Sequence, residues 1–124
     1  MEKRLYQRID TKIDAIIFVD KSEIEATINN FCEEGVEFII NKKYLKKIQV
    51  NKIIDFYFVD TFLNKNDVIL STVKILRIKQ NKEDKDYYFV GCKIKEDNNH
   101  GFYNYVTNVK TQKFIEKISK HYKY

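Results

Sequence analysis

Short runs rich in isoleucine, valine, phenylalanine and tyrosine alternate with asparagine and aspartate along most of this chain. The 124 residues contain no proline and only three glycines. Asparagine and aspartate tolerate left-handed backbone conformations, so we expect them to supply the turns. Asparagine occupies, among other positions, 29, 30, 41, 64, 66, 81, 98 and 99. The runs between them have the composition of strands, which we predict at 14–19, 24–28, 35–40, 53–59, 68–79 and 87–95.

Six short strands with hairpin-length connections favour a small antiparallel barrel over βαβ units. The fold class that we predict is therefore mainly β, a six-stranded antiparallel β-barrel with a C-terminal α-helix. In the fifth run, Val73, Ile75 and Ile78 break strict alternation, which predicts a bulge. We expect one domain, made of an N-terminal arm (1–12), a barrel (13–97) and a helix (100–122).

The helical segment has apolar residues on two different faces. Phe102, Tyr105 and Val109 share one face, whereas Phe114, Ile118 and Tyr122 share another. At 100° per residue the two faces differ by roughly half a turn. This shift predicts a kink or break near Lys110, or a second half that packs elsewhere. The end of the helix would then wrap the barrel, or form a homodimer or partner contact.

Charge and cysteine content limit the partners and the compartment. The net charge of +5, from 23 Lys and Arg against 18 Asp and Glu, favours anionic partners. No apolar run is long enough to span a bilayer, so we expect a cytoplasmic protein without membrane insertion. Cys32 and Cys92 lack metal-ligand spacing, and we expect both to be reduced.

Two polar motifs flank the first predicted strands. Arg4 and Arg8 lie four residues apart in a terminal segment that we expect to be loose until a ligand orders it. The second motif, Asn30–Gly35, falls between two strand-like runs and reads as a tight connection. A planar guanidinium can bind phosphate, stack on a base, or contact O6 and N7 of guanine.

Together the two motifs resemble the PilZ domain, a bacterial receptor domain for cyclic di-GMP. In that pattern Arg-x-x-x-Arg is followed by Asp or Asn, then usually Ser two positions on, then Gly. Asn30 and Gly35 match, whereas Cys32 replaces the serine. The segment 88–94, with its embedded glycine, resembles the late strand of the family, and the resemblance covers nearly the whole chain as a stand-alone domain.

The resemblance implies a nucleotide ligand, cyclic di-GMP, with no cofactor and no metal. Arg4 and Arg8 would clamp guanine and phosphate, Asn30 would read a base edge, and Cys32 and Gly35 would shape the floor of the site. A thiol is a poor hydrogen-bond donor, so Cys32 is expected to lower the affinity. The carboxylates of Glu33 and Glu34 would repel phosphate unless they point away.

No arrangement of residues typical of an active site is present in the sequence, so we expect a non-enzymatic receptor that relays its signal to a protein partner. One alternative is a PilZ-like adaptor that no longer binds nucleotide, which Cys32 and the two glutamates favour. Another is a small basic barrel that binds single-stranded nucleic acid, although the lysines are dispersed; we therefore expect no nucleic acid partner.

Overall fold

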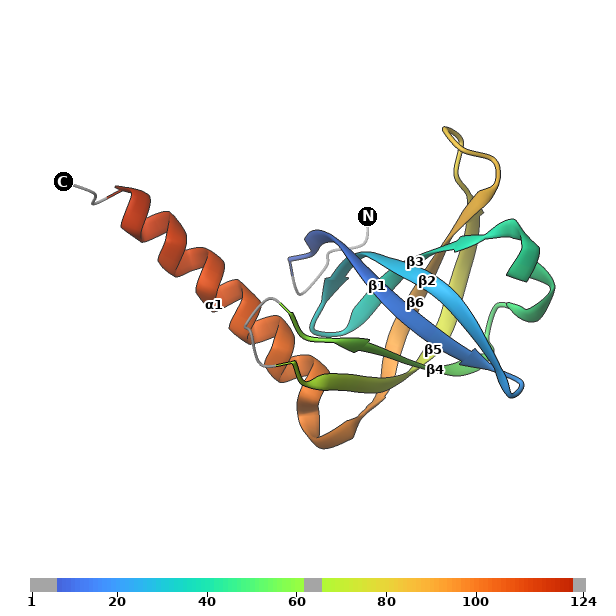
Figure 1. The fold of residues 1–124 in the computed structure, drawn as a ribbon, viewed down its shortest axis with the longest axis horizontal. Helices are drawn as coiled ribbons and strands as arrows, with labels where there is room; N and C mark the ends of the chain where they lie inside the picture. The colour runs from blue at the N-terminus through green and yellow to red at the C-terminus, as the bar shows by residue number, and fades with distance from the viewer. Residues whose placement is uncertain (1–6, 62–65, 122–124) are drawn as a thin grey trace.

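The computed structural model describes residues 7–61 and 66–121, which form a closed antiparallel barrel followed by one long helix (Figure 1). The six predicted strands are all present, in the order β1-β2-β3-β6-β5-β4 around the barrel. Their bounds are β1 Ile9–Val19, β2 Ser22–Cys32, β3 Gly35–Asn41, β4 Ile53–Val59, β5 Val68–Gln80 and β6 Tyr87–Asp97. Short 3-10 helices, η1 (Lys42–Lys47) and η2 (Asn98–His100), lead into β4 and into α1 (Gly101–His121).

The interior of the barrel is apolar and aromatic. Alternate residues of each strand point inward, as in the pattern of β3, where Val36, Phe38 and Ile40 are buried and the residues between them are less so. Phe38 and Phe56 meet edge to face with ring centroids 5.0 Å apart, a favourable aromatic geometry.

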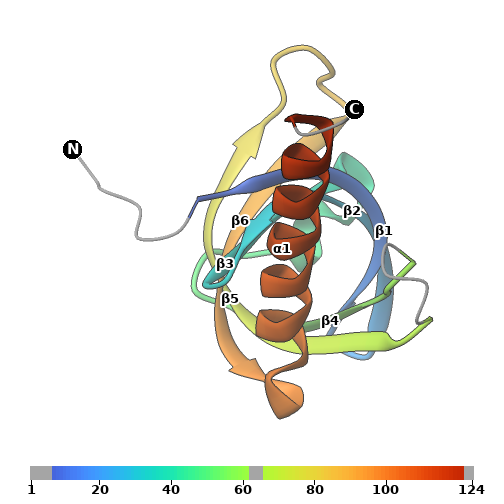
Figure 2. The ribbon, with the colours of Figure 1, turned by 90° about the vertical axis from the view of Figure 1, so that its left-hand side faces the viewer.

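The first half of α1 lies across one end of the barrel (Figure 2). Phe102, Tyr105, Val106 and Val109 are buried, and the ring of Phe102 packs against Phe56 at 5.9 Å between centroids. The Asp97 carboxylate caps the N-terminus of the helix. It accepts hydrogen bonds from the backbone N–H groups of Phe102 and Tyr103, at 2.7 and 2.9 Å. A carboxylate at this position satisfies amides that have no partner within the helix.

The second half of α1 corrects the prediction of a kink. The helix is continuous through Lys110, and its later residues extend away from the barrel instead of wrapping it (Figure 1). Phe114, Ile115 and Ile118 are 63%, 50% and 41% exposed, while Tyr122 lies outside the described residues. Along the described segments, no helix combines the length and apolar character needed to cross a membrane.

The turns follow the predicted chemistry in part. Asp20 and Lys21, with φ of 48° and 67°, join β1 to β2, as a two-residue hairpin turn of left-handed residues requires. Asn51 and Asn66 are also left-handed. Asn29 and Asn30, however, lie within β2 rather than in a turn. Strand β1 begins at Ile9, so residues 9–12 of the predicted arm belong to the barrel.

Candidate ligand-binding site

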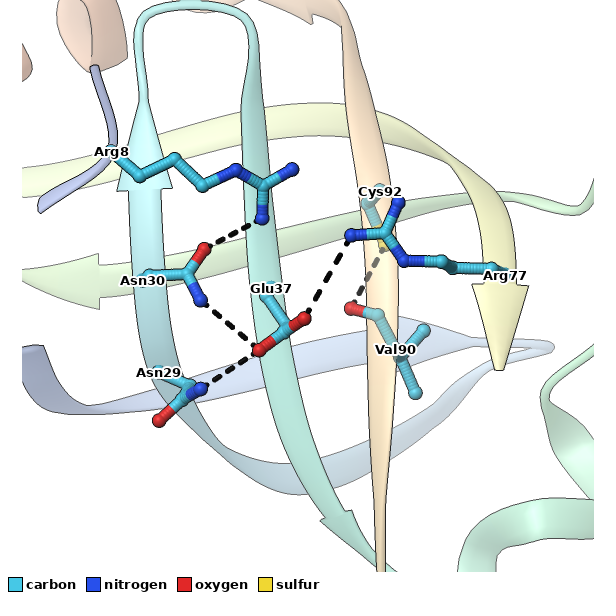
Figure 3. Close-up of polar contacts among 7 residues, drawn as sticks. All are labelled: Arg8, Asn29, Asn30, Glu37, Arg77, Val90 and Cys92. Carbon is cyan, nitrogen blue, oxygen red and sulfur yellow. Dashed lines mark hydrogen bonds and ion pairs between the residues drawn. The ribbon is translucent and has the colours of Figure 1, made fainter. Parts of the chain in front are cut away.

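Four residues in successive strands form a polar row on the outer face of the barrel. Asn30 of β2 is the register partner of Glu37 in β3, Glu37 is the partner of Gly91 in β6, and Gly91 is the partner of Arg77 in β5. Figure 3 shows the side chains of Asn30, Glu37 and Arg77 directed toward one another along this row. We call these four residues the outer row.

A bulge in β2 brings a second asparagine to the outer row. Ile28 pairs with Phe38, and Asn30 pairs with Glu37, so Asn29 is an extra residue in β2. An extra residue of this kind re-aims the side chains beside it. As a result, the amide nitrogens of Asn29 and Asn30 both donate to Glu37 Oε1, at 2.8 and 3.1 Å.

Arg8 connects the N-terminal segment to the outer row. Its Nη1 donates to Asn30 Oδ1 at 2.9 Å, across 22 residues of sequence (Figure 3). The predicted convergence of the arm and the second motif is therefore observed for Arg8. Arg4 lies outside the described residues. A hydrogen bond from a charged group stabilises by about 1.5–3 kcal/mol, so this contact fixes the orientation of the Asn30 amide.

Arg77 reaches the other end of the outer row because Gly91 has no side chain. A Cβ at Gly91 would lie 3.0 Å from Arg77 Cγ and Nε. A bulge between Ile75 and Arg77 confirms the irregularity that the sequence predicted in this strand. Arg77 Nη2 lies 3.9 Å from Glu37 Oε2, with the arginine side chain 51% exposed and the glutamate 16% exposed.

The connection after Asn30 is shorter than the sequence indicated. Cys32 and Gly35 are register partners at the ends of β2 and β3, which leaves only Glu33 and Glu34 in the turn. A Cβ at Gly35 would lie 2.9 Å from the backbone oxygen of Cys92. Glycine is therefore required here by the neighbouring strand β6, whatever the ligand demands.

The two glutamates of this turn differ in their surroundings. The Glu33 carboxylate accepts a hydrogen bond from Lys110 Nζ of α1 at 2.5 Å and is 9% exposed. Its charge is thus balanced by the helix and is less repulsive to an anion than expected. Glu34 is exposed, and its backbone oxygen accepts from the Ile94 amide at 2.8 Å.

A hollow of about 410 Å³ lies beside Asn29, which donates to Glu37 of the outer row. Ile39 and Phe89, paired in the sheet, form part of its lining. Lys12 and Asn29, which are hydrogen-bonded to each other, also line it, with residues 79–83. An apolar surface beside cations suits a base that carries phosphate.

Sequence reasoning missed Glu37, Arg77 and Asn29 as site residues. The sequence carried a signal for two of these three residues. Glu37 follows Gly35 by two residues, so it lies on the same strand face, and Arg77 falls at the break in alternation between Ile75 and Ile78. Within residues 7–61 and 66–121, no cluster of three His, Cys, Asp or Glu side chains could hold a metal ion.

The surroundings of Cys92 show how close the outer row lies to the interior. Burial raises the pKa of the Cys92 thiol to about 12, against a smaller lowering by the charge of Arg77. Both described cysteines are free, as predicted. Cys92 lies on the inner side of β6 and Arg77 over its outer side, so the site and the core share one sheet.

Comparison with known families identifies the class of protein that this barrel and site define. The sequence matches the PilZ domain family over residues 2–104, and the chain belongs to that family. No curated protein sequence matches the chain.

Two solved structures share the fold of this chain. The Bacillus subtilis inhibitor of motility (MotI/DgrA) matches with a TM-score of 0.74 at 15% identity, over 91% of this chain and 54% of that one. The K. pneumonia protein MrkH, in its complex with c-di-GMP, matches with a TM-score of 0.70 at 11% identity, over 97% of this chain and 56% of that one. This chain thus spans little more than half of either protein.

Proposed function

We propose that this chain is a non-enzymatic receptor that binds cyclic di-GMP on the outer face of the barrel. The observation that carries the proposal is the 2.9 Å hydrogen bond from Arg8 to Asn30, because it joins the two halves of the family motif. Membership of the PilZ family supports the same ligand.

In this proposal each residue has a separate task. Arg8, with Arg4, would clamp guanine and phosphate, since a guanidinium binds both. Asn30 would read a base edge, and Cys32 with Gly35 would shape the floor of the site. The ligand must compete for the amide of Asn30, which Arg8 and Glu37 hold in the free protein. Its binding would therefore move the N-terminal segment.

We further propose that this movement is passed to a protein partner. The exposed apolar residues on the second half of α1 offer a surface for a partner or for a second copy of this chain. A cytoplasmic location remains our prediction.

Titration calorimetry with cyclic di-GMP tests the proposal directly. We expect saturable binding by the wild-type chain and much weaker binding by Arg4→Ala/Arg8→Ala, with the mass of both measured in solution. An absence of saturable binding at low salt would contradict the receptor function.

The second candidate is a PilZ adaptor that has lost nucleotide binding. The Glu37 carboxylate at the centre of the outer row, together with Cys32 in place of serine, favours it. If the chain is such an adaptor, cyclic di-GMP would give no binding heat with the wild-type chain or with Arg4→Ala/Arg8→Ala. Cys32→Ser would not restore binding.

A further inference from the structure

Glu37 is an acidic residue in the middle of a site proposed for a dianion. Its Oε1 accepts from both asparagine amides, whereas its Oε2 lies 3.9 Å from Arg77 Nη2. A carboxylate can accept about four hydrogen bonds, and 3.9 Å is too long for one. Oε2 therefore keeps acceptor capacity on the side of the outer row where Arg77 is half-exposed.

Guanine presents the complementary group. Its Watson–Crick edge carries two adjacent donors, N1–H and the N2 amino group, and the ionised carboxylate of Glu37 can accept from them at Oε2. Adenine places an acceptor at N1, which a carboxylate repels. Arginine reads the opposite edge of guanine, at O6 and N7. A carboxylate flanked by guanidinium groups is thus suited to guanine more than to other bases.

We propose that Glu37 reads the Watson–Crick edge of one guanine and sets the base selectivity of the site, an inference that rests on the proposed binding of cyclic di-GMP. The bulge at Asn29 supports this role, because two amides from one strand hold the carboxylate in a fixed orientation. Such prior ordering lowers the cost of binding.

The charges around Glu37 tolerate a phosphate despite its carboxylate. Arg8, Lys12 and Arg77 supply three cations, and Asp10, the exposed register partner of Asn30 in β1, is the second acid beside Glu37. The sum over these five side chains is three minus two, or +1. The carboxylate can therefore accept a hydrogen bond from a base while the cations bind phosphate.

Calorimetry with three cyclic dinucleotides tests the role of Glu37. The ligands are cyclic di-GMP, cyclic di-IMP, which lacks both N2 amino groups, and cyclic di-AMP. Glu37→Gln preserves the shape of the side chain and one acceptor oxygen but replaces the other with a donor. Glu34→Gln is the matched control, because it removes the same charge from an exposed residue in the adjacent turn. Circular dichroism verifies that each variant is folded.

The wild-type chain is expected to prefer cyclic di-GMP over cyclic di-IMP and to reject cyclic di-AMP. Glu37→Gln should weaken cyclic di-GMP by about 10- to 150-fold, the range of one hydrogen bond to a charged group, and should reduce the preference over cyclic di-IMP. Glu37→Asp keeps the charge on a shorter side chain, and its affinity for cyclic di-GMP should lie between those of the wild-type chain and Glu37→Gln. Glu34→Gln should leave the preference unchanged.

Two results would overturn the inference, and they are distinguishable. If the wild-type chain binds cyclic di-GMP and Glu37→Gln keeps the same preference or binds more tightly, only the role of Glu37 fails. If the wild-type chain binds none of the three ligands, the proposed function fails and the inference falls with it.

Discussion

The two faces of the same strands are stabilised by different kinds of interaction. Inside the barrel, Phe38 is fully buried and lies among many apolar neighbours. One residue away on the outer face, Glu37 is held by a few polar contacts with Asn29, Asn30 and Arg77. Interior contacts are numerous and individually weak, so many different sequences can form the same fold. Outer-row contacts are few and directional, so they define one site.

This contrast explains how a fold can persist while most of its sequence changes. The neighbours MotI/DgrA and MrkH share the architecture at only 15% and 11% identity. Substitutions in the interior should therefore change stability, whereas substitutions in the outer row should change binding and leave the barrel intact. The predictions below test that separation, beginning with the largest expected effect.

Phe38→Ala should produce the largest loss of stability. Truncating a fully buried phenylalanine removes its burial and leaves a cavity, which together cost about 3–5 kcal/mol. We expect a large fall in the midpoint of urea unfolding followed by circular dichroism. Glu37→Gln, on the other face of the same strand, is the matched control and should shift the midpoint far less. Equal shifts would mean that the two faces are not separable.

Gly35→Ala and Gly91→Ala form a second pair, in which the same methyl group meets different neighbours. At Gly35 it would meet the backbone oxygen of Cys92 at 2.9 Å, and at Gly91 the flexible side chain of Arg77 at 3.0 Å. Backbone cannot move aside cheaply, so Gly35→Ala should destabilise by about 1–3 kcal/mol, as overpacking does. Gly91→Ala should displace Arg77 and weaken ligand binding with a smaller effect on stability. Thermal unfolding and calorimetry on both variants check this, and a reversed order would contradict it.

Arg8→Ala should separate binding from stability most clearly. The variant loses the contact with Asn30 and one guanidinium from the proposed ligand clamp. We expect cyclic di-GMP affinity to fall by about 1–3 kcal/mol, the value of a bidentate arginine–guanine contact. Lys46→Ala, an exposed site in η1, removes one positive charge elsewhere and serves as the control. Unchanged affinity in Arg8→Ala at low salt would remove Arg8 from the site.

The sequence could predict the interior far better than the outer row, and the reason is physical. Alternating Ile, Val and Phe residues report burial through a period of two, so all six strands were predicted. The meeting of Arg8 with Asn30 followed from the family motif. The hydrogen bond from Asn29 to Glu37 depends on a one-residue bulge, and local composition carries no signal for such a register shift. A continuous α1 was one of two alternatives that the sequence left open, because the apolar residues Phe114 and Ile118, which are exposed, lie off the face of the buried residues.

An alkaline titration should act on the interior through two neutral acids. Burial raises the pKa of Cys92 from 9.0 to about 12. Burial, and then the charge of Asp60, raise the pKa of Tyr105 from 10.0 to about 12. As the pH rises, the unfolded chain loses these protons before the folded chain does. The stabilising contribution of the two groups is therefore fully present below about pH 9 and is lost as the pH rises toward 12. Cys92→Ala should reduce this slope in urea unfolding measured between pH 8 and pH 11, and an unchanged slope would exclude the thiol as a contributor.

Cys32→Ser should have the smallest effect and bears on the second candidate function. Cys32 is partly exposed and lies two residues beyond Asn30, on the same face of β2. A hydroxyl is a better donor than a thiol, so one improved hydrogen bond should tighten cyclic di-GMP binding by about 0.5–1.5 kcal/mol. The substitution should leave the unfolding midpoint nearly unchanged, because the side chain is not part of the buried core. Cys92→Ser, which places the same hydroxyl on the inner face, should instead destabilise the barrel without tightening binding. If neither Cys32→Ser nor the wild-type chain gives binding heat with cyclic di-GMP, the outer row does not bind this nucleotide and the adaptor function is favoured.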